Sequence, residues 1–207
     1  MATKTQTVPA ILSAAMDLAA EQGWSRTTLA EIARRADLPL AEIYRTTGGK
    51  PGILEALSRH ADAQVLSGSA PDMEDHPRDR LFDVLMRRFD ALGPYKPGLM
   101  AVADAAPRDP LPALCTLRQI RRSMEWMLEA AGLSADGWQG AVKSRALAGL
   151  WLSLMRVWFQ DETEDQAKTM AALDARLRRL DEAWNSLPGR RRGRRETQAG
   201  GADGVAA

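Results

Sequence analysis

The chain has 207 residues, 45% of them apolar and 27% charged, which is ordinary for a soluble globular protein of one or two domains. Its net charge is +1, and residues 1–60 carry seven Lys/Arg against six Asp/Glu, so a strongly basic DNA-binding domain is absent. The single cysteine excludes an internal disulfide, and no apolar run approaches the roughly 20 residues that span a bilayer, so we expect a cytoplasmic protein.

Apolar residues at helical spacing predict a first helix that ends at Gly23, which suits a helix C-cap. Thr27 or Thr28 then precedes a short second helix, and Glu31, three residues after Thr28, completes the pattern of a capping box. The expected buried faces of these two helices consist of Val8, Ile11, Leu12, Ala15, Leu18, Ala19, Leu29, Ile32 and Ala33.

The segment 37–39 (DLP) breaks the second helix, and Pro39 suits the opening of the next helix, where its missing N–H costs nothing. The third helix, LAEIYRT, is short, and we expect Ile43 and Tyr44 to point inward. Residues 28–46 therefore have the layout of a helix-turn-helix, in which the second of two short helices enters the major groove of DNA.

The rest of the chain is also helical in pattern. Gly48 and Gly49 separate the third helix from a fourth, and the polar stretch SGSAPDMEDHP is a connector. The acidic cluster DETED is interpreted as a linker that caps the last helix. Predicted helices cover about 51–65, 78–92, 97–105 and 110–131, followed by two long helices, the first with Val142–Trp158 and the second with Met170–Trp184.

Residues 8–57 resemble the DNA-binding domain of the TetR family of transcriptional regulators. The matching elements are AILSAAMDLAAEQGW, TTLAEIARRADL, PLAEIYRTT and GGKPGILEAL. The resemblance implies an all-α protein with an N-terminal three-helix helix-turn-helix domain, residues 1–57, and a larger helical ligand-binding and dimerisation domain, residues 58–187. We expect residues 188–207, which include RRRGRR, to form a disordered basic tail.

The same resemblance implies which residues meet double-stranded DNA. Thr28, at the N-cap of the second helix, would contact a phosphate through its backbone and hydroxyl. Tyr44 and Arg45 would reach the sugar–phosphate backbone, as would Lys50 at the start of the fourth helix, and charge alone supports the two cations. The residues that would face the bases are Pro39, Leu40, Ala41 and Glu42.

Three features depart from the family pattern. Thr47 stands where a core aromatic residue is usual, Gly48-Gly49 stand where one small or polar residue is typical, and Glu42 is an acidic residue facing the groove. A degenerate helix-turn-helix with no DNA partner therefore stays open as an alternative.

The C-terminal half also resembles the lipid-binding ubiquinone-biosynthesis accessory proteins, which share the TetR-like fold. The shared features are an aromatic-rich helix, the linker WFQDETED and the helix TMAALDARLRRL. This alternative function is a protein that does not bind DNA and instead holds isoprenoid or phospholipid at a membrane surface, with Trp151 or Trp158 in contact with the membrane.

The last two helices each have a broad apolar face, and we expect them to pair with those of a second copy in a homodimer. The residues assigned to this interface are Leu150, Trp151, Leu154, Trp158, Leu173 and Leu177. A pocket for an unidentified apolar or amphipathic small-molecule effector is assigned to flexible methionines, with ordinary core packing as the alternative. These are Met86, Met100, Met124 and Met127.

The sequence shows no motif for catalysis, and His60, His76 and Cys115 have no companion at metal-ligand spacing. We therefore expect no enzyme activity, no metal and no cofactor. The function predicted is a transcriptional regulator, and more specifically a repressor that binds a palindromic operator as a dimer. An effector would change the spacing of the two recognition helices through the fourth helix.

Overall fold

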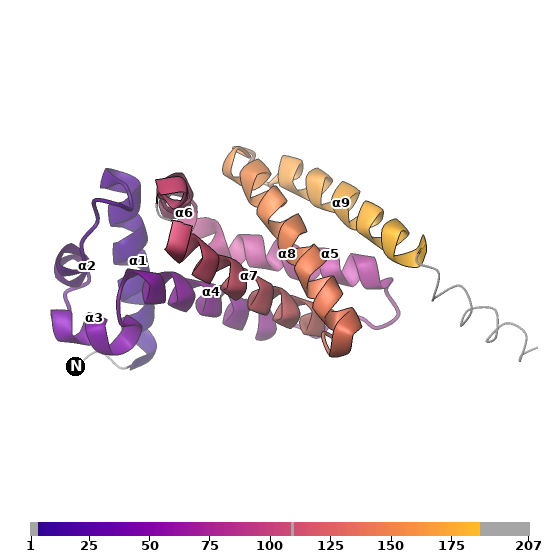
Figure 1. The fold of residues 1–207 in the computed structure, drawn as a ribbon, viewed down its shortest axis with the longest axis horizontal. Helices are drawn as coiled ribbons and strands as arrows, with labels where there is room; N and C mark the ends of the chain where they lie inside the picture. The colour runs from indigo at the N-terminus through magenta and orange to yellow at the C-terminus, as the bar shows by residue number, and fades with distance from the viewer. Residues whose placement is uncertain (1–3, 109, 187–207) are drawn as a thin grey trace, which may run out of the picture.

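The computed structural model describes residues 4–108 and 110–186, and helices dominate them (Figure 1). These residues contain no strand, which confirms the predicted all-α fold, and none of their helices is long and apolar enough to cross a membrane. The predicted tail, residues 188–207, lies outside the described residues. The helices are α1 Lys4–Gln22, α2 Leu29–Arg35, α3 Leu40–Thr47, α4 Lys50–Leu66, α5 Pro77–Leu92, α6 Lys96–Ala105, α7 Pro110–Ala130, α8 Gly137–Phe159 and α9 Ala167–Ser186.

The ends of the first helices follow the local signals of the sequence. Gly23 closes α1 with a left-handed φ of 87°, and its N–H donates to the carbonyl of Ala19 at 2.9 Å. Asp37 turns the chain between α2 and α3 with a φ of 52°, a conformation that Asp tolerates better than most residues. Pro39 occupies the N-cap of α3 and not the first helical position, a shift of one residue from the prediction.

Figure 1 shows α1–α3 at one end of the molecule and α4 running away from them into the larger group of helices. The larger group of helices contacts α1–α3 at a second place, where α6 packs against α1. At this crossing a Cβ on Gly98 would lie 2.5 Å from the carbonyl oxygen of Met16, so the two backbones are in direct contact. The buried core is continuous from α1 to α9, and the predicted boundary at 57/58 falls within α4.

A buried ion pair joins α4 to the larger domain. Arg88 on α5 contacts the carboxylate of Asp62 on α4, and the side chains of both are almost fully buried. Ser123 on α7 donates to the same carboxylate at 2.5 Å, and Arg88 donates to Ser58 at 3.2 Å. The guanidinium also lies over the ring of Trp151 on α8, and burial lowers the pKa of Arg88 to about 10. Four helices therefore meet at one charged group.

Asp161 organises the corner between α8 and α9. Its carboxylate accepts hydrogen bonds from the N–H of Thr169 at 2.7 Å and the hydroxyl of Thr163 at 2.5 Å, among others. Burial by itself would raise the pKa of Asp161, but the hydrogen bonds from Thr163 and Thr169 outweigh it and hold the pKa well below its usual range. Lys96 at the start of α6 donates to the Asp161 carbonyl at 2.6 Å. The prediction that this acidic linker caps the last helix is confirmed.

Replacing Asp62 with alanine leaves the Arg88 guanidinium buried without a counter-ion. We expect the free energy of unfolding to fall by about 3–5 kcal/mol, whereas the double variant Asp62→Val/Arg88→Met, which removes both charges, stays close to the parent. Chemical denaturation at a single protein concentration measures both. A double variant as unstable as Asp62→Ala would contradict this account of the pair.

Asp161→Asn tests the capping carboxylate through its pH dependence. Because folding lowers the pKa of Asp161, its ionised form stabilises the fold above its unfolded pKa of about 3.9, and this contribution is lost as the pH falls below that value. We expect the parent to be about 2 kcal/mol more stable than Asp161→Asn at pH 7. The difference should shrink below pH ~4, as followed by denaturation at several pH values. A difference independent of pH would contradict the assignment.

Candidate nucleic-acid interface

The N-terminus of α2 is closed by the predicted capping box. Thr28 caps the helix, accepting from the N–H of Glu31 at 3.2 Å, while the Glu31 carboxylate accepts from both the N–H and the hydroxyl of Thr28, at 2.9 and 2.7 Å. Hydrogen bonds from Thr28 lower the pKa of Glu31. The two donors that were expected to meet a phosphate are therefore held by a carboxylate, which a phosphate would have to displace.

Helix α3 is anchored by one buried side chain and exposes about half of the others. Ile43 is fully buried, whereas Leu40 is 51% and Tyr44 is 75% exposed. The expectation that Tyr44 points inward is therefore wrong, because consecutive residues lie about 100° apart around a helix and the face that meets the core is centred on Ile43. Pro39, Ala41 and Arg45 are also exposed, and Glu42 is half-buried. The exposed face of α3 therefore presents apolar and aromatic side chains to the outside of the domain.

Arg45 is paired with Glu42 on the same face of α3, and Thr46 donates to the other oxygen of that carboxylate at 3.3 Å. The Arg45 side chain is 70% exposed. An exposed pair one turn apart on a helix contributes only about 0.3–0.5 kcal/mol, so a phosphate can take over the guanidinium at little cost. Glu42 lowers the positive charge of α3 without fixing Arg45 in place.

Lys50 has a different environment from Arg45. Its side chain is half-buried, and Nζ donates to the carbonyl oxygens of Trp24 at 2.5 Å and Thr27 at 2.9 Å. Burial lowers the pKa of Lys50. Both carbonyls belong to the turn between α1 and α2, so the ammonium points into the domain. Sequence reasoning could not find these partners, which lie 26 and 23 residues earlier in the chain.

Thr47, where the family pattern has an aromatic residue, is half-buried at the junction of α3 and α4. Gly48 ends α3 with a φ of 68°, and Gly49 has a φ of 145°. A Cβ on Gly52 would lie only 1.7 Å from the Thr47 carbonyl oxygen, so α4 passes directly against the end of α3. The Thr47 hydroxyl donates to the Ile43 carbonyl at 2.9 Å.

Arg26 is a basic residue near the interface that sequence reasoning missed. It is exposed in the turn before α2, and its Nε donates to the Gln22 carbonyl at 2.5 Å. A cation beside the N-cap was visible in the sequence, but its exposure and its place next to Thr28 depend on how the turn closes. It adds to the positive charge at this end of the domain.

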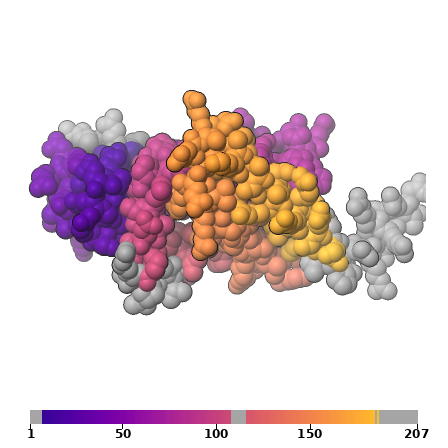
Figure 2. All heavy atoms as spheres, turned by 90° about the horizontal axis from the view of Figure 1, so that it is seen from above, coloured from indigo at the N-terminus to yellow at the C-terminus, as the bar shows by residue number. Residues whose placement is uncertain are grey.

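The residues assigned to the dimer interface lie inside the protomer. Trp151, Leu154, Trp158, Leu173 and Leu177 are buried, and Leu150 is half-buried. Phe89 on α5 stacks on Trp151 with ring centroids 4.3 Å apart. The outward face of α8 instead carries Trp138, Val142, Gly149 and Leu152. Figure 2 shows α8 and α9, in orange and yellow, on an uncovered face of the molecule. Dimerisation stays a prediction, with this outer face in place of the buried one.

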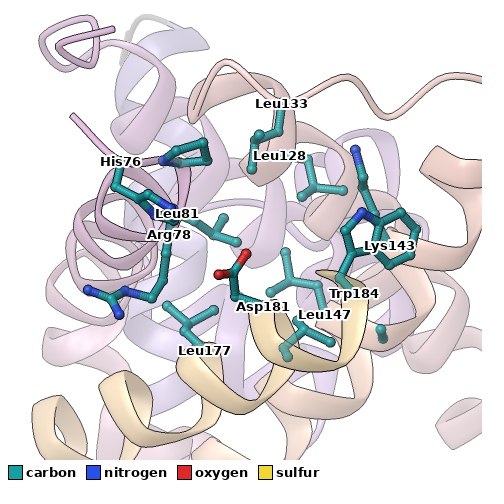
Figure 3. A pocket seen from close by; sticks show the side chains of 13 residues that line it. His76, Arg78, Leu81, Leu128, Leu133, Lys143, Leu147, Leu177, Asp181 and Trp184 are labelled. Atoms are coloured by element: carbon teal, nitrogen blue, oxygen red, sulfur yellow. Dashed lines mark hydrogen bonds between the residues drawn. The ribbon is translucent and has the colours of Figure 1, made fainter. Parts of the chain in front are cut away.

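A cavity of about 290 Å³ lies between the start of α5, the end of α7, and α8 and α9 (Figure 3). Leucines are the most numerous of its lining residues, and Asp181 directs its carboxylate toward the middle, with Lys143 and Trp184 to one side and His76 to the other. None of the predicted methionines lines it. Met124 and Met127 are fully buried, Met86 is half-buried and Met100 is 40% exposed, so their role in ligand binding stays a prediction.

Gly52→Ala should disturb the α3–α4 junction, because its Cβ would overlap the Thr47 carbonyl and one helix must move. We expect a loss of about 1–3 kcal/mol in the free energy of unfolding. Gly93→Ala is the matched control, since Gly93 has a helical φ of −47° and nothing lies within 4 Å of the added Cβ. Urea denaturation compares the two. Equal stability of both variants would show that α3 and α4 are not in tight contact at this junction.

The comparisons with known proteins agree with this geometry. Residues 11–57 match the family described as bacterial regulatory proteins, tetR family. No curated protein sequence is significantly similar to the chain. Among solved structures, a TetR transcriptional regulator from Nitrosomonas europaea is 23% identical, with a TM-score of 0.68 over 86% of this chain and 98% of its own.

Two further structures have the same fold. A TetR transcriptional regulator from Rhodococcus sp. RHA1 is 22% identical, with a TM-score of 0.55 over 84% of this chain and 97% of its own. NalD of Pseudomonas aeruginosa, the secondary repressor of the MexAB-OprM multidrug efflux pump, is 20% identical, with a TM-score of 0.51 over 84% and 97%. The helix-turn-helix sequence thus matches the tetR family of bacterial regulatory proteins, and the chain as a whole has the fold of TetR transcriptional regulators.

Proposed function

We propose that this protein is a transcriptional regulator that binds DNA with α3 in the major groove. The observation that carries the proposal is the outer face of α3, where Leu40 and Tyr44 are exposed although the helix is fixed to the core by Ile43. Exposing two large side chains on one short helix does not help the protomer to fold. It would help a recognition helix to bind DNA, because the outer residues of such a helix contact bases and backbone.

The charges of the helix-turn-helix domain predict how the free energy of DNA binding is divided between phosphate contacts and base contacts. Phosphate contacts supply most non-specific affinity, and here Glu31 and Glu42 already occupy Thr28 and Arg45. Non-specific binding should therefore be weak. Discrimination between sequences then rests on base contacts from Pro39, Leu40, Ala41 and Glu42, whose carboxylate accepts from a cytosine amino group when it faces one.

Binding to a palindromic operator requires two copies whose recognition helices lie about 34–36 Å apart. The outward face of α8 offers a surface for such a dimer. Val142 is 43% and Leu152 is 37% exposed there, and a Cβ on the intervening Gly149 would meet nothing within 4 Å. A helix of a second copy can approach closely at a glycine, so we place the dimer contact on this face together with α9.

The effector response is assigned to the cavity between α5, α7, α8 and α9. Its leucine walls fit an apolar or amphipathic small molecule, and Asp181 and Lys143 offer charges that would orient it. The proposed repressor role rests on likeness to NalD, described as a repressor of an efflux pump. A ligand acts here only by binding the DNA-competent and DNA-incompetent arrangements with different affinity. Both α4 and the α1–α6 contact connect the two parts of the protein.

A second candidate function is lipid binding at a membrane surface without DNA binding. Trp151 and Trp158, which were assigned to that surface, are 2% and 1% exposed and cannot reach a membrane while the protomer is folded. Two other tryptophans favour the candidate, since Trp138 is 72% and Trp126 is 50% exposed. Co-sedimentation with liposomes that is lost in Trp138→Ala, in a protein that ignores DNA sequence, would support it.

The DNA-binding proposal is tested by fluorescence anisotropy with the DNA upstream of the protein's own gene, against scrambled DNA of equal length. We expect discrimination of about a thousandfold at near-physiological salt. Arg45→Gln should weaken binding and reduce the slope of log K against log salt by about 0.9, the value of one phosphate contact. The control is Arg121→Gln, a partly exposed arginine paired one turn away on α7, outside the proposed dimer contact. Weak binding that ignores sequence and vanishes with salt would contradict the proposal.

The dimer proposal predicts that Leu152→Asp converts the protein to a monomer, because it places a charge in the apolar face of α8. Sedimentation velocity over a range of protein concentrations measures the change. Leu117→Asp serves as the control, since Leu117 on α7 is 45% exposed and lies outside the proposed contact. If Leu152→Asp remains a dimer, or if Leu117→Asp is a monomer, the dimer interface lies elsewhere on the protomer.

A further inference from the structure

The ammonium group of Lys50 is bound within the protein itself. Its Nζ donates to the carbonyls of Trp24 at 2.5 Å and Thr27 at 2.9 Å and lies 4.5 Å from the centre of the Trp24 ring. The side chain is half-buried at the first residue of α4. All three contacts are on the turn that joins α1 to α2, so one cation connects the start of α4 to a turn distant in sequence.

The turn carries carbonyls that its own backbone satisfies poorly. The Trp24 carbonyl accepts from the Thr27 N–H only at 3.3 Å, a long bond that the same N–H shares with Gly23 at 3.3 Å. Thr27 is 2% exposed, so water has little access to its backbone. An ammonium carries three donors and no acceptor, and hydrogen bonds to a charged donor are stronger than those to a neutral one. Lys50 therefore provides the donors that this part of the turn lacks.

Two glycines before Lys50 and one after it determine the position of the first turn of α4. Gly48 and Gly49, with φ of 68° and 145°, turn the chain sharply between α3 and α4. Gly52 then lets α4 pass against the Thr47 carbonyl. The path of the chain through these glycines brings the first turn of α4 against the α1–α2 turn. Arg45, five residues earlier, is 70% exposed and contacts only residues of its own helix among the bonds described.

We propose that Lys50 is a positioning residue, which ties the first turn of α4 to the α1–α2 turn and so fixes the orientation of α2 and α3 relative to α4. Its ammonium makes no phosphate contact in this role. The consequence for operator affinity rests on the proposed DNA-binding function, but the tie itself is a property of the free protein. Loss of Lys50 would lower affinity by loosening the recognition helix and would leave the number of phosphate contacts unchanged.

The first arm of the test uses the free protein and needs no DNA. Lys50→Met keeps an unbranched apolar stem as far as Cε and removes the ammonium, and Arg45→Gln is the matched removal of a cation from the same domain. Amide hydrogen exchange is measured for residues 23–32 and, as an internal reference, for α5 and α9. We expect Lys50→Met to speed exchange in residues 23–32 by about tenfold, as for the loss of a charge-assisted hydrogen bond, without changing the reference helices.

Arg45→Gln should leave exchange in the turn unchanged. If Lys50→Met exchanges like the parent in residues 23–32, the tie is overturned, whatever happens with DNA. Lys50→Gln repeats the measurement in case the methionine variant fails to fold. Faster exchange that is confined to the turn supports the tie even if the protein proves not to bind DNA.

The second arm uses salt dependence, which separates a positioning residue from a phosphate contact. With the operator found above, Lys50→Met should bind at least about tenfold more weakly at each salt concentration, with the slope of log K against log salt unchanged. Arg45→Gln should reduce that slope by about 0.9. A slope reduced equally by Lys50→Met would show that the ammonium reaches a phosphate and would overturn the proposal.

Discussion

A carboxylate and a guanidinium meet inside the larger domain, and the placement of α4 depends on their contact. Asp62 and Arg88 are both removed from water, so neither can lose the other without leaving an unpaired charge in a medium that solvates it poorly. Ser58 accepts a further hydrogen bond from Arg88, Ser123 donates one to Asp62, and the guanidinium lies over the ring of Trp151. Because α4 begins directly after α3, a pair that fixes its far half to α5 and α7 also helps to fix the position of α3, the helix proposed to contact DNA.

Several groups of the helix-turn-helix domain that could meet a phosphate are already bound within the domain. Glu31 occupies the N-terminus of α2, Glu42 pairs with Arg45, and two carbonyls hold Lys50. These contacts differ in how easily they can be exchanged. The exposed pair on α3 contributes little and can give way to a phosphate. If the half-buried ammonium of Lys50 moved to a phosphate, two carbonyls would lose their charged donor. Under the proposed function, near-neutral net charge and internal pairing would together limit non-specific attraction to DNA.

The two faces of α8 have separate roles in this arrangement. Its inner face carries Trp151, Leu154 and Trp158 into the core, where they pack against Phe89 and complete the protomer. The outer face carries exposed apolar residues around Gly149 and is the surface that a second copy can cover. The cavity beside the inner face is bounded by α9 and the end of α7. Ligand and partner would therefore act on opposite sides of the same helix.

Local signals in the sequence determined the helix order, the capping box at Thr28, the left-handed end at Gly23 and the acidic cap at Asp161, because each depends on residues within a few positions of one another. Periodicity also identified the apolar faces of α8 and α9. It could not say whether those faces meet the protomer's own core or a partner, since both surfaces are equally apolar. The exposure of Tyr44, the partners of Lys50, the buried Asp62–Arg88 pair and the site of the cavity were decided only by tertiary structure. Each of them depends on groups brought together from distant parts of the chain, and spacing in the sequence carries no information about such distances.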